Sequence, residues 1–424
     1  MKLKVRLLAA LSLGSVTFAG SALATAQDAV QVRPPGARPA AQSVEHNLWA
    51  ASADAEREAM RSALRIEDER LQSYVREVTC RVVPEHCGDV RAQAFRRPAF
   101  NAFVMPNGYI EVWSGLMLRA SNEAELAFVL AHEGAHFTGN HSLRQWESAK
   151  RTQGALLALS IVASAAATFD ANYVDYGRYV DVLTTAAYLG GLASLFAYSR
   201  EFEFEADAVG QRRLAAAGYD PRAAASIWRT VIRLDQASDN ERIRRSESRG
   251  SVFRTHPLTM DRLTTLETAA AALPVGTGRF EGAPQTGELG EARYREMIRP
   301  FLAGWLRDEL RGRDFGATLA LLTQLEAGGD AGMIGYFKGE VYRLRRSAGD
   351  EDRAIAAYQA ATTHSDCPPE AWRELGTSLN RKGDRPGALA AFEAYIAHAP
   401  DAPDAPLVTR QIERLRTAIN SPAS

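Results

Sequence analysis

The sequence has almost no net charge, very little cysteine and few histidines. Its 50 Lys and Arg residues balance 51 Asp and Glu residues, so the formal charge is −1 at pH 7. Nucleic-acid binding depends on an excess of basic charge, and its absence argues against a nucleic-acid partner. Three cysteines in 424 residues leave room for a single intramolecular disulfide, and only eight histidines are available for metal binding or acid-base chemistry.

The sequence also lacks an apolar run of the ~20 residues that a membrane-spanning helix needs. An apolar stretch over residues 7–19 follows three basic residues and precedes Ala24-Thr25-Ala26, with no later cysteine nearby to take a lipid. This pattern predicts a secretory signal peptide over residues 1–26, cleaved near Ala26, and an uncleaved anchor is the alternative. The mature chain would carry 47 Lys and Arg against 51 Asp and Glu, a charge of −4.

Two further apolar runs lie at residues 154–169 and 182–199. As helices they would be about 24 and 27 Å long, below the bilayer core of about 30 Å. Both are rich in alanine, and the second contains Gly190-Gly191. We therefore expect residues 152–198 to form a helical insertion that is buried in its domain, or that contacts a membrane surface through residues 154–199, rather than a membrane span.

Cys80 and Cys87 are close in sequence, with Pro84 and Gly88 nearby. In an oxidising compartment we expect them to form a disulfide, which leaves Cys367 alone. A metal site made of the two cysteines and His86 is the competing interpretation, but a complete site would need ligands that this stretch lacks.

The segment His132-Glu133-Gly134-Ala135-His136 places two imidazoles and a carboxylate on one helical turn. Histidines four residues apart share a helix face, so both rings can reach one metal ion, while Glu133 stands beside the open coordination position. Asn122, with Glu125 three positions later, predicts a capped start for this helix. The pattern predicts a zinc site in which Glu133 is the general acid and base.

The third ligand is expected from the acidic segment 199–207. Glu203 and Asp207 share a face at i and i+4, so Glu203 can bind the metal while Asp207 accepts a hydrogen bond from a ligand histidine. Glu201 and Glu205 point away from that face and are expected to be solvated charges. The histidines outside the motifs are expected to be surface or packing residues: His46, His86, His141 (one residue off the helical face), His364 and His398.

With the His132–His136 motif, the segment 199–207 and Arg254-Thr255-His256-Pro257, the sequence resembles the gluzincin family of the CAAX prenyl endopeptidases and the HtpX heat-shock protease. The resemblance covers about residues 60–270. It is strongest to the periplasmic branch typified by the beta-barrel assembly-enhancing protease, which joins a signal peptide, this catalytic domain and tetratricopeptide repeats. It implies one zinc ion per chain bound by His132, His136 and Glu203, with Glu133 catalytic and Asp207 supporting a ligand.

His256 is the candidate for a second electrophile. It would stabilise the oxyanion of the reaction, or close the site by contacting zinc, and ordinary packing is the alternative for a lone histidine.

The C-terminal third of the sequence contains a repeated motif. Residues 369–400 match the tetratricopeptide pattern at Trp372, Gly376, Ala388, Phe392 and Pro400, and a second match, with a longer turn, contains Gly339, Tyr342, Ala354 and Tyr358. A degenerate unit occupies about residues 298–331. Stacked helix pairs of this kind can bind peptides on a concave face, and a stabilising cap on the catalytic domain is the alternative.

These observations predict a mostly helical α+β fold: a zincin-like catalytic domain with a small β-sheet, followed by an α-helical repeat domain. Residues 101–113 alternate around Pro106-Asn107-Gly108 and predict a hairpin, whose first strand would either hold an extended peptide or only complete the sheet. The expected domains are a flexible leader at 27–43, a metalloprotease domain at 44–273, a linker at 274–290 and repeats at 291–418.

The favoured function is a periplasmic zinc endopeptidase that degrades misfolded or stalled envelope proteins, in particular outer-membrane proteins. The repeats would recruit these polypeptide substrates or the outer-membrane assembly machinery. The alternative is a repeat-based chaperone or adaptor whose zinc domain is structural or latent.

Overall fold

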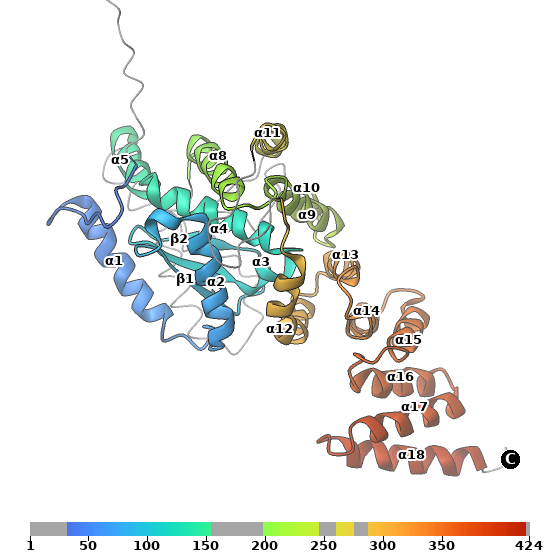
Figure 1. The fold of residues 1–424 in the computed structure, drawn as a ribbon. Helices are drawn as coiled ribbons and strands as arrows, with labels where there is room; N and C mark the ends of the chain where they lie inside the picture. The colour runs from blue at the N-terminus through green and yellow to red at the C-terminus, as the bar shows by residue number, and fades with distance from the viewer. Residues whose placement is uncertain (1–31, 154–197, 246–259, 275–286, 421–424) are drawn as a thin grey trace, which may run out of the picture. The chain divides into compact units, whose positions relative to one another are not determined.

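The computed structural model describes residues 32–153, 198–245, 260–274 and 287–420. Over these ranges the chain is mostly helical with one three-stranded sheet, which confirms the α+β expectation (Figure 1). The predicted signal peptide, most of the helical insertion and most of the linker lie outside the described residues. No helix within the described ranges is both long and apolar enough to cross a bilayer.

The elements up to the start of the insertion are α1 (Val44–Ala59), α2 (Glu69–Val82), η1 (Pro84–His86), β1 (Arg91–Phe95), β2 (Ala102–Val104), β3 (Tyr109–Trp113), α3 (Ser114–Arg119), α4 (Glu123–Thr138) and α5 (His141–Gln153). The later elements are α8 (Arg200–Ala216), α9 (Ala223–Ala237), α10 (Glu241–Arg245), α11 (Met260–Ala270), α12 (Glu291–Arg311), α13 (Phe315–Glu326), α14 (Ala331–Arg345), α15 (Asp350–Ala361), α16 (Glu370–Arg381), α17 (Arg385–His398) and α18 (Ala405–Asn420).

The sheet has the order β1-β3-β2, with β1 parallel and β2 antiparallel to β3. The predicted hairpin is confirmed as β2 and β3, and its turn contains Gly108 at φ 84°. A Cβ on Gly108 would lie 2.4 Å from the Asp89 carbonyl oxygen, so only glycine fits the turn. Among the described residues β2 pairs with β3 alone, which makes β2 an edge strand.

One face of the sheet and two helices form the core around α4. Ile110 and Val112 of β3 belong to the same buried apolar cluster as Leu71 and Val78 of α2 and the apolar residues of α4, and every residue of α4 is buried. The predicted cap is present: Asn122 Oδ1 accepts from the Glu125 backbone N–H at 2.9 Å, and Glu125 Oε2 accepts from the Ser121 N–H at 2.8 Å. Both bonds satisfy backbone donors at the start of α4.

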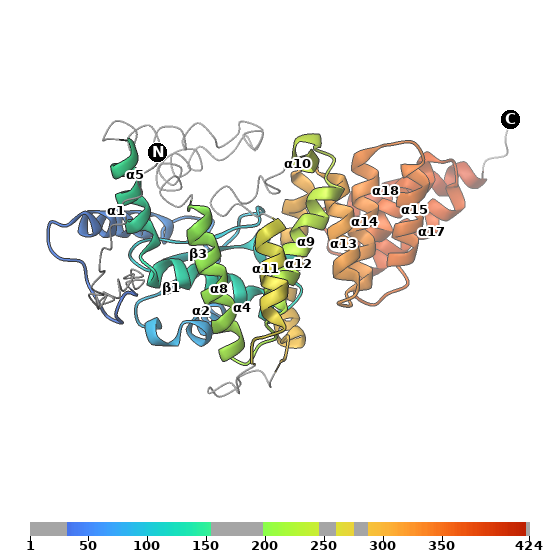
Figure 2. The same ribbon diagram turned by 90° about the horizontal axis from the view of Figure 1, so that it is seen from above.

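Helix α8 packs directly against α4 (Figure 2). Gly210 makes this close approach possible, because a Cβ at this position would lie only 3.0 Å from the His132 backbone nitrogen. A larger residue there would push the two helices apart. Glycine at this contact therefore brings the acidic residues of α8 to the histidines of α4.

Part of the segment predicted as a leader is bound to the end of α4. The Arg33 backbone N–H donates to the Thr138 carbonyl at 2.7 Å, and the Arg33 guanidinium pairs with Glu45 and lies 4.9 Å from the Phe137 ring. The Gly36 N–H donates to Asp89 Oδ2 at 2.9 Å. The backbone around Pro34 and Gly36 is thus irregular, and hydrogen bonds hold it in place.

Residues 287–293, which we call the junction, connect α12 to both α4 and α8. The Gly287 N–H donates to the Gly218 carbonyl, just after α8, at 2.9 Å. The Leu289 carbonyl accepts from the Ala124 N–H in the first turn of α4 at 3.0 Å. Arg293 Nη1 lies 3.2 Å from Glu123 Oε2, so the junction satisfies both a backbone donor and a buried acid at the start of α4.

Helices α12 and α13 continue this attachment. Tyr294 donates to the Met117 carbonyl at 2.5 Å, and Arg96 binds both oxygens of Asp308 at 2.6 and 3.0 Å. Asp314, at the start of α13, accepts a hydrogen bond at 2.8 Å from the backbone N–H of Asp239, which follows the end of α9. The first two helices of the predicted repeat region therefore pack against the domain that contains α4.

Helices α14 to α18 pack on one another in chain order (Figure 1). Two equivalent contacts recur: a Cβ on Gly339 would lie 2.3 Å from Tyr358, and one on Gly376 would lie 2.8 Å from Phe392. In both helix pairs a glycine of the first helix admits an aromatic ring of the second. The repeated sequence pattern thus corresponds to a repeated packing contact.

Candidate metal centre

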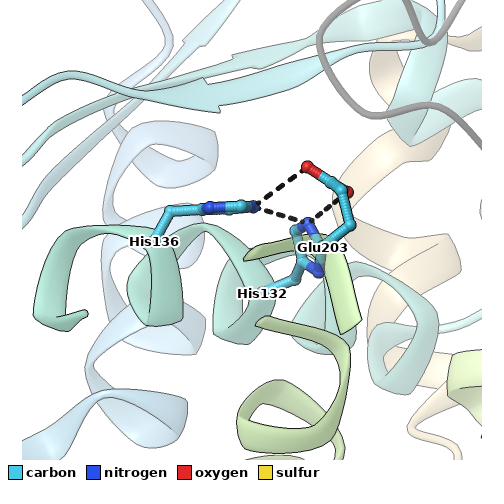
Figure 3. A group of neighbouring side chains, drawn as sticks. All are labelled: His132, His136 and Glu203. Carbon is cyan, nitrogen blue, oxygen red and sulfur yellow. Dashed lines mark hydrogen bonds and ion pairs between the residues drawn. The ribbon is translucent and has the colours of Figure 1, made fainter. Parts of the chain in front are cut away.

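Three buried side chains from α4 and α8 converge at one point (Figure 3). The Nε2 atoms of His132 and His136 face each other at 3.0 Å. Glu203 Oε2 lies 3.6 Å from His132 Nε2, and Glu203 Oε1 lies 3.5 Å from His136 Nε2. The exposed fractions are 2% for His132, 1% for His136 and 1% for Glu203, so the group is shielded from bulk water.

This donor set fits a zinc ion. The ligand atoms all lie within 4.8 Å of one another. Two ligand atoms at about 2.0 to 2.1 Å from a tetrahedral zinc ion are about 3.3 Å apart, close to the separations found here. Two imidazoles and one carboxylate also form a ligand set used by zinc hydrolases, which keep a further position open.

Asp207 lies behind His132, as the spacing on α8 predicted. Asp207 Oδ1 is 3.0 Å from His132 Nδ1. Burial would raise the pKa of Asp207, but the charge and hydrogen bonds of Arg262, together with His132, lower it to about 2. Asp207 is therefore a carboxylate at neutral pH and accepts the Nδ1 proton, which directs the His132 Nε2 lone pair toward the ligand position.

Arg262 of α11 completes this cluster and was not predicted from the sequence. Its Nη1 lies 2.7 Å from Glu203 Oε2, while Nε and Nη2 bind Asp207 at 2.6 and 2.8 Å. The guanidinium also lies 5.3 Å from the Trp228 ring. A signal was present: two carboxylates on one buried helix face require a cation, and an arginine follows Pro257 of the Arg254–Pro257 motif five positions later in the sequence.

Glu133 lies between the two histidines on α4 and is buried. Tyr198, just before α8, stacks on the His136 ring at a centroid distance of 3.8 Å, and its hydroxyl is 2.9 Å from Ser142 Oγ. Burial raises the pKa of Tyr198, and the nearby charges of Glu133 and Glu203 raise it further. Tyr198 is therefore neutral and covers one side of the His136 ring.

His141 belongs to the site, although the sequence analysis set it aside. Its Nδ1 lies 2.8 Å from His136 Nδ1, and its Nε2 lies 3.3 Å from Glu205 Oε1. The helical-face argument does not reach His141, because α4 ends at Thr138 and Asn140, at φ 52°, interrupts the helix before α5 begins at His141. Glu205 is likewise not simply a solvated charge. Burial, together with Arg144 and His132, lowers the pKa of His141 to about 4, although Glu205 opposes this shift.

The remaining predicted residues have different outcomes. Cys80 and Cys87 form the expected disulfide, with their Cα atoms 4.7 Å apart, and Cys367 is a free thiol. His256 lies in the range 246–259, outside the described residues. Because Cys80 and Cys87 are bonded to each other, the alternative metal site made of these cysteines and His86 is excluded.

Comparisons with known proteins agree with the geometry. Residues 65–270 match the model of peptidase family M48. The putative beta-barrel assembly-enhancing protease of Vibrio cholerae is 30% identical over 213 residues, which are 49% of this chain and 41% of that protein. The beta-barrel assembly-enhancing protease of Escherichia coli is 28% identical over 208 residues, which are 48% of this chain and 39% of that protein.

The mitochondrial metalloendopeptidase OMA1 of Schizosaccharomyces pombe is 33% identical over 142 residues, which are 34% of this chain and 36% of that protein. The chain thus covers between 36% and 41% of the length of these three relatives. The family model matches the segment that contains both histidines, Glu133, Glu203 and Arg262, so residues 65–270 form a peptidase family M48 domain.

Proposed function

We propose that this protein is a zinc-dependent endopeptidase. The observation that carries the proposal is the buried convergence of His132, His136 and Glu203 next to Glu133 on a single helical turn. The three residues would hold one zinc ion per chain. The names of the similar proteins, which include protease and metalloendopeptidase, support the same reaction class.

The described residues can each take a separate role in peptide hydrolysis. A bound zinc ion would supply Lewis-acid polarisation of the scissile carbonyl. Glu133 would take a proton from the attacking water and deliver it to the leaving amine. Asp207 fixes the His132 tautomer, and Arg262 pairs with the Glu203 carboxylate. His256 would stabilise the oxyanion, or would close the resting site.

The edge strand β2 offers a binding place for an extended polypeptide. Its outer backbone groups are not paired with another described strand, and an added strand would satisfy them. Val104, at the end of β2, and Met105 line the same small hollow as His136. A peptide paired with β2 would therefore pass beside the metal ligands.

The cellular role that we propose is quality control in the bacterial envelope. The predicted signal peptide and the disulfide are consistent with export to the periplasm. Two similar proteins are named for beta-barrel assembly. We therefore propose misfolded or stalled outer-membrane proteins as substrates. The helix pairs with Gly339–Tyr358 and Gly376–Phe392 contacts would form tetratricopeptide-like repeats that recruit these substrates or the assembly machinery.

The test is hydrolysis by the purified full-length protein. An unstructured peptide and a misfolded outer-membrane protein would each be incubated with the protein alone, with a chelator, and with zinc restored after chelation. We expect cleavage that the chelator stops and zinc restores. Zinc-loaded protein that prevents aggregation of the outer-membrane protein but cleaves neither substrate would instead support the chaperone alternative.

A further inference from the structure

The two ligand histidines have different partners at their Nδ1 atoms. His132 Nδ1 faces the Asp207 carboxylate at 3.0 Å. His136 Nδ1 faces a second imidazole, that of His141, at 2.8 Å. The carboxylate on this side is one ring further away, because His141 Nε2 contacts Glu205 Oε1 at 3.3 Å.

Only one arrangement of protons gives a neutral pair of imidazoles that binds a metal. If His136 Nε2 is to donate its lone pair to the metal, the ring proton must be on Nδ1. The Nδ1 atom of His141 then accepts this proton in a hydrogen bond. The proton of His141 must consequently be on Nε2, where Glu205 accepts it. Glu205 is held in turn by Arg144, whose Nη1 lies 3.0 Å from Glu205 Oε2.

The surroundings hold the plane of the His141 ring. The ring is fully buried and stacks on Phe202, with centroids 4.7 Å apart and an interplanar angle of 18°. On the other side, a Cβ on Gly139 would lie 2.5 Å from His141 Nε2. Gly139 caps the C-terminus of α4, so the backbone there provides the space that the ring occupies.

We propose that His141 and Glu205 are positioning residues for the metal ligand His136. His141 fixes the tautomer and the direction of the His136 ring, and Glu205 fixes the tautomer of His141. They correspond on this side of the site to Asp207 on the other side. The inference rests on the zinc site of the proposed function, but it concerns how strongly the site holds the ion rather than which reaction it catalyses.

The experiment measures zinc affinity of the full-length protein by competition with a chelator of known strength. His141→Leu removes the acceptor for His136, while His141→Gln keeps both an acceptor and a donor. Glu205→Gln keeps an acceptor but removes the charge. Glu201→Gln on the exposed side of the same helix is the matched control. The thermal unfolding of each zinc-free variant is recorded alongside.

We expect His141→Leu to weaken zinc binding by about 10- to 100-fold, in the range seen when the partner of a ligand histidine is lost. His141→Gln should recover most of this affinity, and Glu201→Gln should bind zinc like the unmodified protein. Nitrogen-15 spectra of the zinc-loaded protein should show the His136 proton on Nδ1. A purely structural role for His141 would lower the unfolding temperature of the zinc-free protein without changing the affinity of the folded fraction.

Three results would overturn the inference. These are unchanged zinc affinity in His141→Leu, an affinity loss in that variant that His141→Gln does not restore at all, and a proton on His136 Nε2 in the zinc-loaded protein. Failure of the unmodified protein to bind zinc is a separate outcome, since it would remove the proposed function itself together with this inference.

Discussion

The Arg262 guanidinium lies 2.7 Å from the Glu203 carboxylate, and both side chains are almost fully buried. The same guanidinium binds both oxygens of Asp207. One positive charge therefore serves two neighbouring carboxylates in a space that excludes water. Because an unpaired buried charge is costly, the Arg262 cation offsets the charge of the two neighbouring carboxylates.

Replacing Arg262 should accordingly destabilise the protein. We expect Arg262→Met to lower the free energy of unfolding by about 3 to 5 kcal/mol, since the substitution leaves two buried carboxylates without their cation. Denaturant unfolding of the zinc-free protein measures this change. Arg229→Met is the matched control, because Arg229 forms an exposed ion pair with Glu267 that should contribute about 1 kcal/mol or less. Equal effects of the two substitutions would contradict this account of the cluster.

The junction predicts where the chain can be shortened. A chain that ends near Pro274 loses the Leu289 acceptor and the Arg293 cation at the start of α4, and it should unfold at a markedly lower temperature than the full chain. A chain that ends near Gly328 keeps α12 and α13 and should still bind zinc and cleave a short peptide. Thermal unfolding, zinc content and peptide hydrolysis of the two truncated proteins test this.

Substrate recruitment by α14 to α18 has its own readout in the longer truncated protein. Cleavage of a short peptide should be retained, whereas turnover of a misfolded outer-membrane protein should fall.

Two outcomes would contradict these predictions. Similar stability of both truncated chains would show that the junction is dispensable. Equal loss on both substrates in the longer one would show that the last helices are a structural cap.

The features of the site and of the sheet differ in how far the sequence could predict them. The helix of His132 and His136, its Asn122 cap and the β2–β3 hairpin depend on neighbours within one or two turns, and local patterns predicted them. Arg262 and His141 depend on where other helices end and how they pack. Their roles appear only when α8 and α11 are placed against α4.

The contacts of the junction could not be predicted from the sequence for a related reason. Glycine and proline in residues 274–290 indicate irregular backbone, and such backbone can be either free or bound. The hydrogen bonds of the junction to Gly218 and Ala124 join residues more than 60 positions apart, and no local sequence pattern indicates such contacts. The same reasoning applies to Arg33, whose partners Thr138 and Phe137 lie on α4.

Reduction of the Cys80–Cys87 disulfide should lower stability by about 2 to 3 kcal/mol, because a short closed loop removes conformational entropy from the unfolded chain. The measurement is denaturant unfolding of the protein and of a variant with both cysteines replaced by serine. Peptide mapping without reductant should find the two residues linked. A stability change close to zero would mean that the disulfide does not constrain the unfolded chain.

The free thiol of Cys367 should react slowly. Burial, with further contributions from Asp366 and Glu370, raises the pKa of Cys367 to about 11. A raised pKa reduces the thiolate fraction at any lower pH, so alkylation at pH 8 should be at least about 100-fold slower than in the unfolded protein. The rate should rise about tenfold per pH unit up to about pH 10 while the protein stays folded. Equal rates for folded and unfolded protein at pH 8 would refute this.

The central claim is that Glu133 performs acid-base chemistry beside a zinc ion held by His132, His136 and Glu203. The most direct measurement determines zinc content and peptide hydrolysis in the same preparations of the unmodified protein and of Glu133→Gln. The account predicts about one zinc per chain in both, with hydrolysis reduced at least about 100-fold in the variant. A Glu133→Gln protein that holds zinc and cleaves peptide at the unmodified rate would contradict it.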